Sequence, residues 1–199
     1  MARKKSITDT QILDMAYQIV IESGFKVFTA RNIARHLNCS TQPIYLEFNS
    51  MGELKKAVMM RLRKDLKNQL GQRYTSDPLV DLGLAFADFV VSEPLLYNAV
   101  FVQGHFGVDE IRDFLDQQTD SMLMDYQPVA GLSAEQRHDL LNALWIVATG
   151  LGNLQASGFV TLTDDQRSEM LSSVLQDFIA NGRFTNSTSA IALDHTAAL

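Results

Sequence analysis

Three polar side chains in the first quarter of the chain have a spacing that brings them together on a helix. Thr41, Gln42 and Tyr45 lie at positions i, i+1 and i+4, and residues three or four apart are neighbours on a helical surface. Glutamine can pair with adenine N6 and N7, a threonine methyl can contact thymine, and a tyrosine hydroxyl can bond a phosphate. Thr41 and Gln42 are therefore predicted to read bases, and Tyr45 to contact the DNA backbone.

The element that must position these side chains is a short helix packed against another one. Apolar spacing predicts helices over 30–37 and 41–47, a separation typical of a helix-turn-helix, whose second helix enters the major groove. In the turn, Asn38 tolerates a positive φ, and Ser40 is expected to cap the second helix. The alternative is an ordinary helical hairpin with solvated polar faces.

The rest of the chain is also predicted to be helical, because apolar residues recur three or four positions apart almost everywhere. We expect an all-α protein of about nine helices. Capping boxes mark four helix starts at Thr8/Gln11, Ser50/Glu53, Ser133/Gln136 and Thr163/Gln166. The remaining predicted helices cover 9–23, 51–73, 79–92, 94–103, 108–126, 134–157 and 164–181.

Charge is divided unevenly along the chain. Residues 1–73 contain 13 Lys or Arg against 6 Asp or Glu, whereas residues 74–199 contain 4 against 17. A basic segment attracts a polyanion by releasing its counterions, and an acidic body is repelled by the same polyanion. The charge distribution therefore favours a nucleic acid as the partner of the N-terminal part and orients the molecule on it.

Several classes of protein are disfavoured by the composition. No apolar run reaches the roughly 18–20 residues of a membrane span, and no secretory apolar segment follows the basic start, so we expect a cytoplasmic protein without a membrane partner. The single cysteine and 4 scattered histidines predict neither a disulfide nor a metal site. Without a metalloprotease, phosphate-loop or serine-elbow motif, we expect no enzyme and no cofactor.

The segment 12–54 resembles the DNA-binding head of the tetracycline-repressor (TetR) family of transcriptional regulators. The residues that carry the resemblance are Ile12-Leu13-Asp14-Met15-Ala16, Gly24-Phe25, Thr29-Ala30-Arg31-Asn32-Ile33-Ala34, Cys39-Ser40-Thr41-Gln42-Pro43-Ile44-Tyr45-Leu46-Glu47-Phe48 and Ser50-Met51-Gly52-Glu53-Leu54. Chain length and helix number agree with the family. The resemblance implies a homodimeric regulator, a repressor relieved by a ligand, that binds double-stranded operator DNA.

The resemblance also implies a division into domains. Residues 1–50 are expected to form a helix-turn-helix DNA-binding domain, and 51–73 a connecting helix. Residues 74–182 then form a helical ligand-binding and dimerisation domain, and 183–199 a polar tail. The acidic part of the chain would thus lie away from the DNA.

Carried across by position, the resemblance assigns roles to single residues. Thr29 would bond a phosphate near the start of its helix, and Pro43 would face bases beside Gln42. The basic N-terminal arm could reach the flanking backbone or the minor groove. The predicted DNA-binding set is Arg3, Lys4, Lys5, Thr29, Ser40, Thr41, Gln42, Pro43, Tyr45, Glu47, Lys55 and Lys56.

Two positions depart from the family pattern. The family usually has His or Tyr where Glu47 stands, and Lys where Met51 stands. Glu47 would repel a phosphate, although it could accept a hydrogen bond from cytosine N4. Lys55, Lys56 and the N-terminal arm could compensate. The alternative function is therefore a helical interaction or ligand-sensing module with weakened DNA binding.

Aromatic and methionine residues of the second domain could line a pocket for a small apolar effector. Each of them could equally belong to the plain core. His105 and Thr149 are the candidate polar groups of such a pocket. The complete candidate set is Phe86, Phe89, Tyr97, Phe101, His105, Phe106, Met122, Trp145 and Thr149.

The predicted helix over 134–157 has two apolar faces, one of which could pack against a second copy of the chain. Together with the last helix it could form a four-helix dimer interface, with small residues such as Gly150 allowing close approach. The predicted interface residues are Leu144, Val147, Leu151, Leu154, Leu171, Leu175 and Phe178. A buried central helix in a monomer is the alternative.

Two further features have a plain structural explanation. Asp109, Asp113, Asp116 and Asp120 form an acidic stripe, which is expected to be solvated or to face a partner, since carboxylates on one straight helix cannot surround a cation. Cys39 is expected to act as a small buried hydrophobe, and a redox sensor is the alternative.

Overall fold

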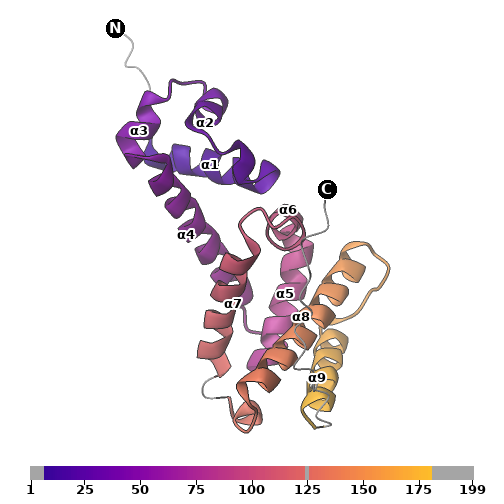
Figure 1. Cartoon of the computed structure of the whole chain (residues 1–199). Coiled ribbons are helices and arrows are strands. Elements are labelled where there is room, and N and C mark those ends of the chain that lie inside the picture. Colours follow the sequence, from indigo (N-terminus) through magenta and orange to yellow (C-terminus); the bar gives the residue numbers. More distant parts are fainter. Residues whose placement is uncertain (1–6, 124–125, 181–199) are drawn as a thin grey trace, which may run out of the picture.

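The computed structural model describes residues 7–123 and 126–180, and all of its regular elements are helical (Figure 1). The predicted all-α class is therefore confirmed. Arg3, Lys4 and Lys5 and the predicted tail 183–199 lie outside the described residues. Among the described helices, none is long and apolar enough to cross a membrane.

The N-terminal helices form a small head at one end of the molecule (Figure 1). They are α1 (Asp9–Ser23), the 3₁₀ turn η1 (Phe25–Val27), α2 (Ala30–His36) and α3 (Gln42–Phe48). The predicted capping box fixes the start of α1, because Thr8 and Gln11 bond each other's backbone N–H groups. Gly24 follows α1 with φ 71°, a value that disfavours side chains with a Cβ.

The turn between α2 and α3 corrects one prediction. Asn38 has the expected positive φ of 52°, but Ser40 does not cap α3. The helix begins at Gln42, its N-cap is Thr41, and Thr41 makes no capping hydrogen bond. A side-chain cap needs an extended backbone, whereas Thr41 already has helical angles, φ −74° and ψ −13°. Pro43 in the first turn also removes one N–H that a cap would serve.

The remaining helices form the body. They are α4 (Met51–Leu70), α5 (Pro78–Ser92), α6 (Pro94–Tyr97), the π-helical turn η2 (Asn98–Val102), α7 (Val108–Leu123), the 3₁₀ turn η3 (Gln127–Val129), α8 (Ala134–Ala156) and α9 (Asp164–Ala180). Most predicted helix ends agree with the structure to within three residues. The single helix expected over 94–103 is instead an α turn followed by a π turn, in which Gln103 donates to the carbonyl of Asn98 over 2.8 Å.

Helix α5 is the centre of the body and packs along α8 (Figure 1). Eleven of its 15 residues are buried. Its contact with α8 is close at Gly152, where an added Cβ would lie 2.7 Å from Cβ of Val90. Helix α4 runs from the head into the body, and Leu54, Leu62 and Leu66 on it are fully buried. One hydrophobic cluster extends from α1 along α4 to α5 and α7.

Candidate nucleic-acid interface and effector cavity

Helix α3 has a polar outer surface and a buried inner face. Ile44 is completely buried under it and belongs to the core of the head. Gln42 is exposed and Tyr45 is 48% exposed, while Thr41 and Pro43 are half-buried. The residues predicted to meet DNA therefore share the outer side of a helix whose inner side is anchored.

Sequence reasoning missed one exposed residue of α3. Leu46 is 71% exposed, and Glu47 beside it is exposed as well. Leu46 lies four residues after Gln42, so the helical spacing could have placed it on the same surface. An exposed leucine can contact a thymine methyl as an alanine or threonine methyl does.

The flanking groups of the head differ in how free they are. Thr29 is exposed, and its hydroxyl accepts from the N–H of Asn32 at 3.2 Å, which leaves the hydroxyl proton for a phosphate. Lys55 is exposed, but its ammonium lies 4.7 Å from the centre of the Phe25 ring. Lys56 is exposed without a comparable contact among the described residues, and Ser40 is exposed in the turn. Lys56 is thus the freer cation of the pair.

Most of the predicted effector residues pack against one another. The Phe86 ring has Trp145 at 4.9 Å and Phe101 at 5.1 Å in edge-on geometry, and Phe89 and Tyr97 join the same cluster. These side chains fill space between α5, α6 and α8. The structure places them in core packing, which is the alternative that the sequence left open.

Two other members of that set join the head to the body. The His105 ring lies against Gly24, where an added Cβ would be 3.1 Å from it, and its Nδ1 is 3.2 Å from the carbonyl oxygen of Val20. Phe106 is 2% exposed and packs edge-on against Phe25, with ring centres 5.9 Å apart. We call this set of contacts the head–body junction.

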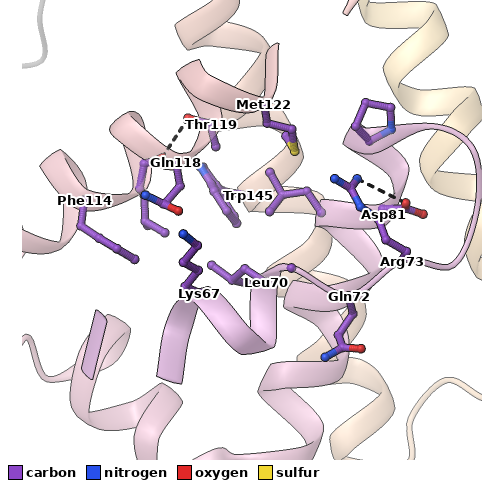
Figure 2. A pocket seen from close by; sticks show the side chains of 14 residues that line it. Lys67, Leu70, Gln72, Arg73, Asp81, Phe114, Gln118, Thr119, Met122 and Trp145 are labelled. Carbon is purple, nitrogen blue, oxygen red and sulfur yellow. Dashed lines mark hydrogen bonds and ion pairs between the residues drawn. The ribbon is translucent and has the colours of Figure 1, made fainter. Parts of the chain in front are cut away.

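A cavity of about 190 Å³ lies elsewhere in the body, between the end of α4, the start of α5, and α7 (Figure 2). Of the candidate effector residues, Trp145 of α8 and Met122 of α7 line it and Thr149 does not. The lining residues that sequence reasoning missed include Lys67, Leu70, Phe114 and Gln118. Nothing in their local pattern separates them from ordinary amphipathic positions, because the cavity forms where α4 meets α7.

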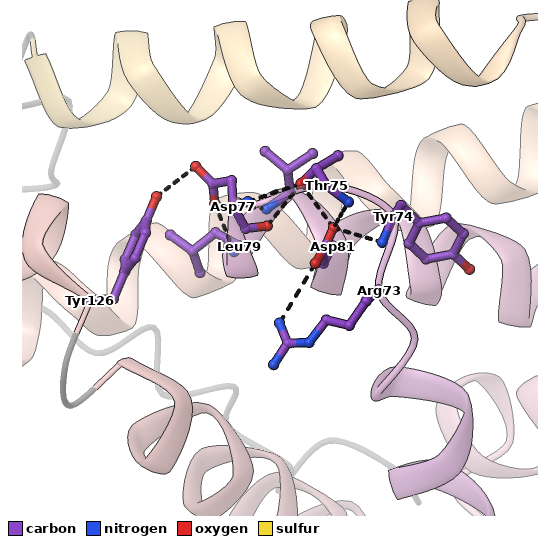
Figure 3. Close-up of polar contacts among 8 residues, drawn as sticks. Arg73, Tyr74, Thr75, Asp77, Leu79, Asp81 and Tyr126 are labelled. Carbon is purple, nitrogen blue, oxygen red and sulfur yellow. Dashed lines mark hydrogen bonds and ion pairs between the residues drawn. The ribbon is translucent and has the colours of Figure 1, made fainter.

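The connection from α4 to α5 is fastened by the buried carboxylate of Asp81, and the half-buried Asp77 lies beside it (Figure 3). Asp81 is 2% exposed; its Oδ1 accepts from the N–H groups of Tyr74 and Thr75 at 3.1 and 2.6 Å, and its Oδ2 lies 3.6 Å from the Arg73 guanidinium. Asp77 accepts from the hydroxyl of Tyr126 at 2.6 Å. Burial and this carboxylate raise the pKa of Tyr126 above its ordinary value.

The predicted dimer residues divide into two groups. Leu144, Leu151, Leu171 and Leu175 are at most 4% exposed and pack inside their own chain. Leu154 is 42% exposed, and Val147 and Phe178 are half-buried. The sequence prediction also left out Ile146, which is 73% exposed on α8.

The two remaining features have ordinary surroundings. On α7, Asp109, Asp113 and Asp120 are exposed, and Asp109 pairs with Arg112 at 3.3 Å. Within the described part of the chain, no group of three or more His, Cys, Asp or Glu residues is placed to hold a metal ion. Cys39 is half-buried against the core of the head.

Comparison with solved structures identifies the fold. A TetR-like transcriptional regulator from Rhodococcus sp. RHA1 superposes with a TM-score of 0.56 and 22% identity, covering 89% of this chain and 98% of that one. A TetR family protein from Vibrio parahaemolyticus superposes with a TM-score of 0.58 and 18% identity. The match covers 84% of this chain and 96% of that one. No protein-family model and no curated protein matches the sequence. The chain therefore has the fold of TetR-family regulators, as its first quarter implied.

Proposed function

We propose that the protein is a sequence-specific DNA-binding transcriptional regulator, a homodimeric repressor that a small ligand releases from its operator. The observation that carries this proposal is the outer surface of α3, where Gln42 and Tyr45 are exposed above the fully buried Ile44. A helix held in this way can enter the major groove without rearrangement. The two structural neighbours, both regulators by description, support the same function.

The charge distribution supports DNA as the partner. Lys56 is exposed near the start of α4, and Thr29 offers a hydroxyl proton at the start of α2. Contacts of this kind go to phosphates and set the register of a protein on the duplex, whereas Gln42 would read a base. The N-terminal cations Arg3, Lys4 and Lys5 extend the basic part of the sequence.

For the dimer, we propose the outer face of α8 together with α9. Ile146 and Leu154, about two turns apart on α8, are 73% and 42% exposed. Val147 and Phe178 would complete the contact from half-buried positions. A second copy of this face, related by a two-fold axis, would cover these residues.

For the switch, we propose that a ligand in the cavity moves α4. Lys67 and Leu70, in the last turn of α4, line the cavity, while the other end of α4 packs against α1 and α3 in the head. Such a ligand must bind the DNA-incompetent arrangement more tightly than the competent one, because a ligand without that preference shifts nothing.

A salt-dependent binding assay tests the proposed function. The full chain is titrated onto a labelled duplex from its own promoter region and onto a random duplex of equal length, at several salt concentrations. We expect tighter binding to the promoter duplex and a linear fall of log affinity with log salt. Equal affinity for both duplexes at every salt concentration would contradict sequence-specific regulation.

One observation favours a second candidate, an interaction or ligand-sensing module with weak DNA binding. Glu47 is exposed on α3 beside the predicted base readers, and a carboxylate there is repelled by phosphates. In this case neither duplex would be bound at physiological salt, although the chain would still dimerise. Replacement by Glu47→Gln distinguishes the two candidates, since it would restore binding only if repulsion is the obstacle.

A further inference from the structure

We propose that the cavity between α4 and α7 binds a small organic anion that consists of one apolar ring and one carboxylate. This inference deepens the proposed function by naming the class of effector, and its regulatory meaning rests on that function. The binding of the anion does not rest on the proposed function, because it depends only on the residues that line the cavity.

The walls are mostly apolar. Leu70, Leu82, Phe114, Leu115, Met122 and Trp145 supply them. Thr119 adds only its methyl group, since its hydroxyl donates to the carbonyl oxygen of Leu115 at 2.9 Å. A volume of about 190 Å³ exceeds the ~150 Å³ that accommodates benzene in an apolar protein cavity. The space therefore suits one ring with one small substituent.

The charged side chains that line the cavity are Lys67, Arg73 and Asp81, and their net charge is positive. Lys67 is exposed at the edge of the cavity, and Figure 2 shows its side chain extending toward Gln118. No hydrogen bond or ion pair of Lys67 is formed among the described residues. The other cation, Arg73, already pairs with the buried Asp81 at 3.6 Å. One unmatched ammonium group remains, and it matches one carboxylate.

The polar neighbours of Lys67 do not supply that carboxylate. Gln118 is neutral, and the Gln72 amide is directed to the carbonyl oxygen of Asn68 at 3.1 Å. Asp113 and Asp120 of α7 are exposed and do not line the cavity. A cationic ligand would be repelled by Lys67 and Arg73, whereas a neutral ring would gain a cation–π contact but no charge-assisted hydrogen bond. A hydrogen bond from an ammonium to a carboxylate is about twice as strong as a neutral one.

Three probes of nearly equal size test the inference on the full chain without DNA. Benzoate, benzamide and benzylamine carry the same ring with a negative, neutral and positive substituent, and their dissociation constants are measured by calorimetry. We expect benzoate to bind about tenfold or more tightly than benzamide, and benzylamine to bind weakest. Equal affinities, a preference for benzylamine, or no binding of any probe at millimolar concentration would overturn the proposal.

A matched pair of variants locates the site. Lys67→Gln should weaken benzoate about tenfold and leave benzamide unchanged, whereas Lys64→Gln should change neither, because Lys64 is exposed on the same helix and does not line the cavity. Equal losses in the two variants would show general attraction by the basic helix, and the inference would be wrong.

The two proposals fail in distinguishable ways. If benzoate binds as expected but the promoter duplex is not bound above random DNA, the proposed function is wrong and the anion site stands. If the promoter duplex is bound specifically but the probes show no charge preference, the regulator stands and the effector class is wrong.

Discussion

The exposed side chains of the head differ in the information that they can take from DNA. Under the proposed function Gln42 would read a base edge, whereas Lys56 would act as a point charge that attracts any phosphate. Both are exposed, so their removal should cost little folding stability. Their effects on DNA binding can therefore be measured without correction for misfolding.

We predict that Gln42→Ala changes sequence preference while Lys56→Ala does not. Loss of the glutamine should cost roughly 1–3 kcal/mol on the operator and nothing on random DNA, whereas loss of the lysine should weaken both alike. Competition titrations with both duplexes measure the difference. Equal losses on both duplexes for Gln42→Ala would refute its role as a base reader.

At the start of α4, we predict that Met51→Lys tightens DNA binding and steepens the salt dependence by roughly one unit, because it adds one phosphate contact. Met51 is half-buried against the core of the head, and the methylene stem of a lysine can keep that packing. The control is Met60→Lys, at a position 64% exposed further along α4. An unchanged slope for Met51→Lys would mean that α4 begins too far from the DNA backbone.

At the scale of elements, the α4–α5 connection depends on one carboxylate. Asp81 accepts three hydrogen bonds, one of them from the Thr75 hydroxyl at 2.9 Å. Because the segment after Leu70 is held by these bonds rather than by helical ones, α4 stops there and not at residue 73, as the sequence had predicted.

We predict that Asp81→Ala lowers the free energy of unfolding by about 2–4 kcal/mol, since it removes a buried carboxylate that accepts three hydrogen bonds. Asp113→Ala, at an exposed position of α7, should change it by less than about 0.5 kcal/mol. Chemical denaturation followed by circular dichroism measures both. Similar small losses in the two variants would show that Asp81 does not fasten the connection.

Local signals predicted helix starts well and tertiary neighbours poorly. The boxes at Thr8 and Ser133 are formed completely, because a cap involves only residues three apart. At Ser50 only half is formed, since Glu53 instead accepts from the Asn49 side chain at 3.2 Å. Phe89 and Met122 were equal candidates by type, yet one is in the core and the other lines the cavity. That difference depends on how α4, α7 and α8 meet, which helical periodicity does not contain.

At the scale of the whole molecule, the proposed dimer can be tested without damage to the core. We predict that Ile146→Asp yields a folded monomer whose unfolding midpoint no longer depends on protein concentration, because Ile146 is 73% exposed in the single chain. Leu151→Asp is the contrasting variant: at 4% exposure it should destabilise the chain itself. Light scattering at micromolar concentration reports the mass. A dimeric Ile146→Asp protein would place the interface elsewhere.

Release from DNA should obey thermodynamic reciprocity. We predict that an effector which weakens operator binding by a given factor is itself bound more weakly, by that same factor, when the operator is present. To change the ratio of the DNA-incompetent to the DNA-competent state from 1:99 to 99:1, the effector must bind the DNA-incompetent state about 10⁴-fold more tightly. Calorimetry with and without the duplex measures the coupling. A ligand that binds the cavity and leaves operator affinity unchanged would contradict the switch.

The head–body junction limits how freely the parts of this chain can be exchanged with those of other proteins of the same fold. Phe106 packs on Phe25, and the His105 ring occupies the space beside Gly24. A head grafted onto a foreign body would lose both rings and expose the apolar surface that they cover. Functional chimeras would therefore have to carry residues 104–106 together with the head. The segments that must be transferred together are thus not continuous in sequence.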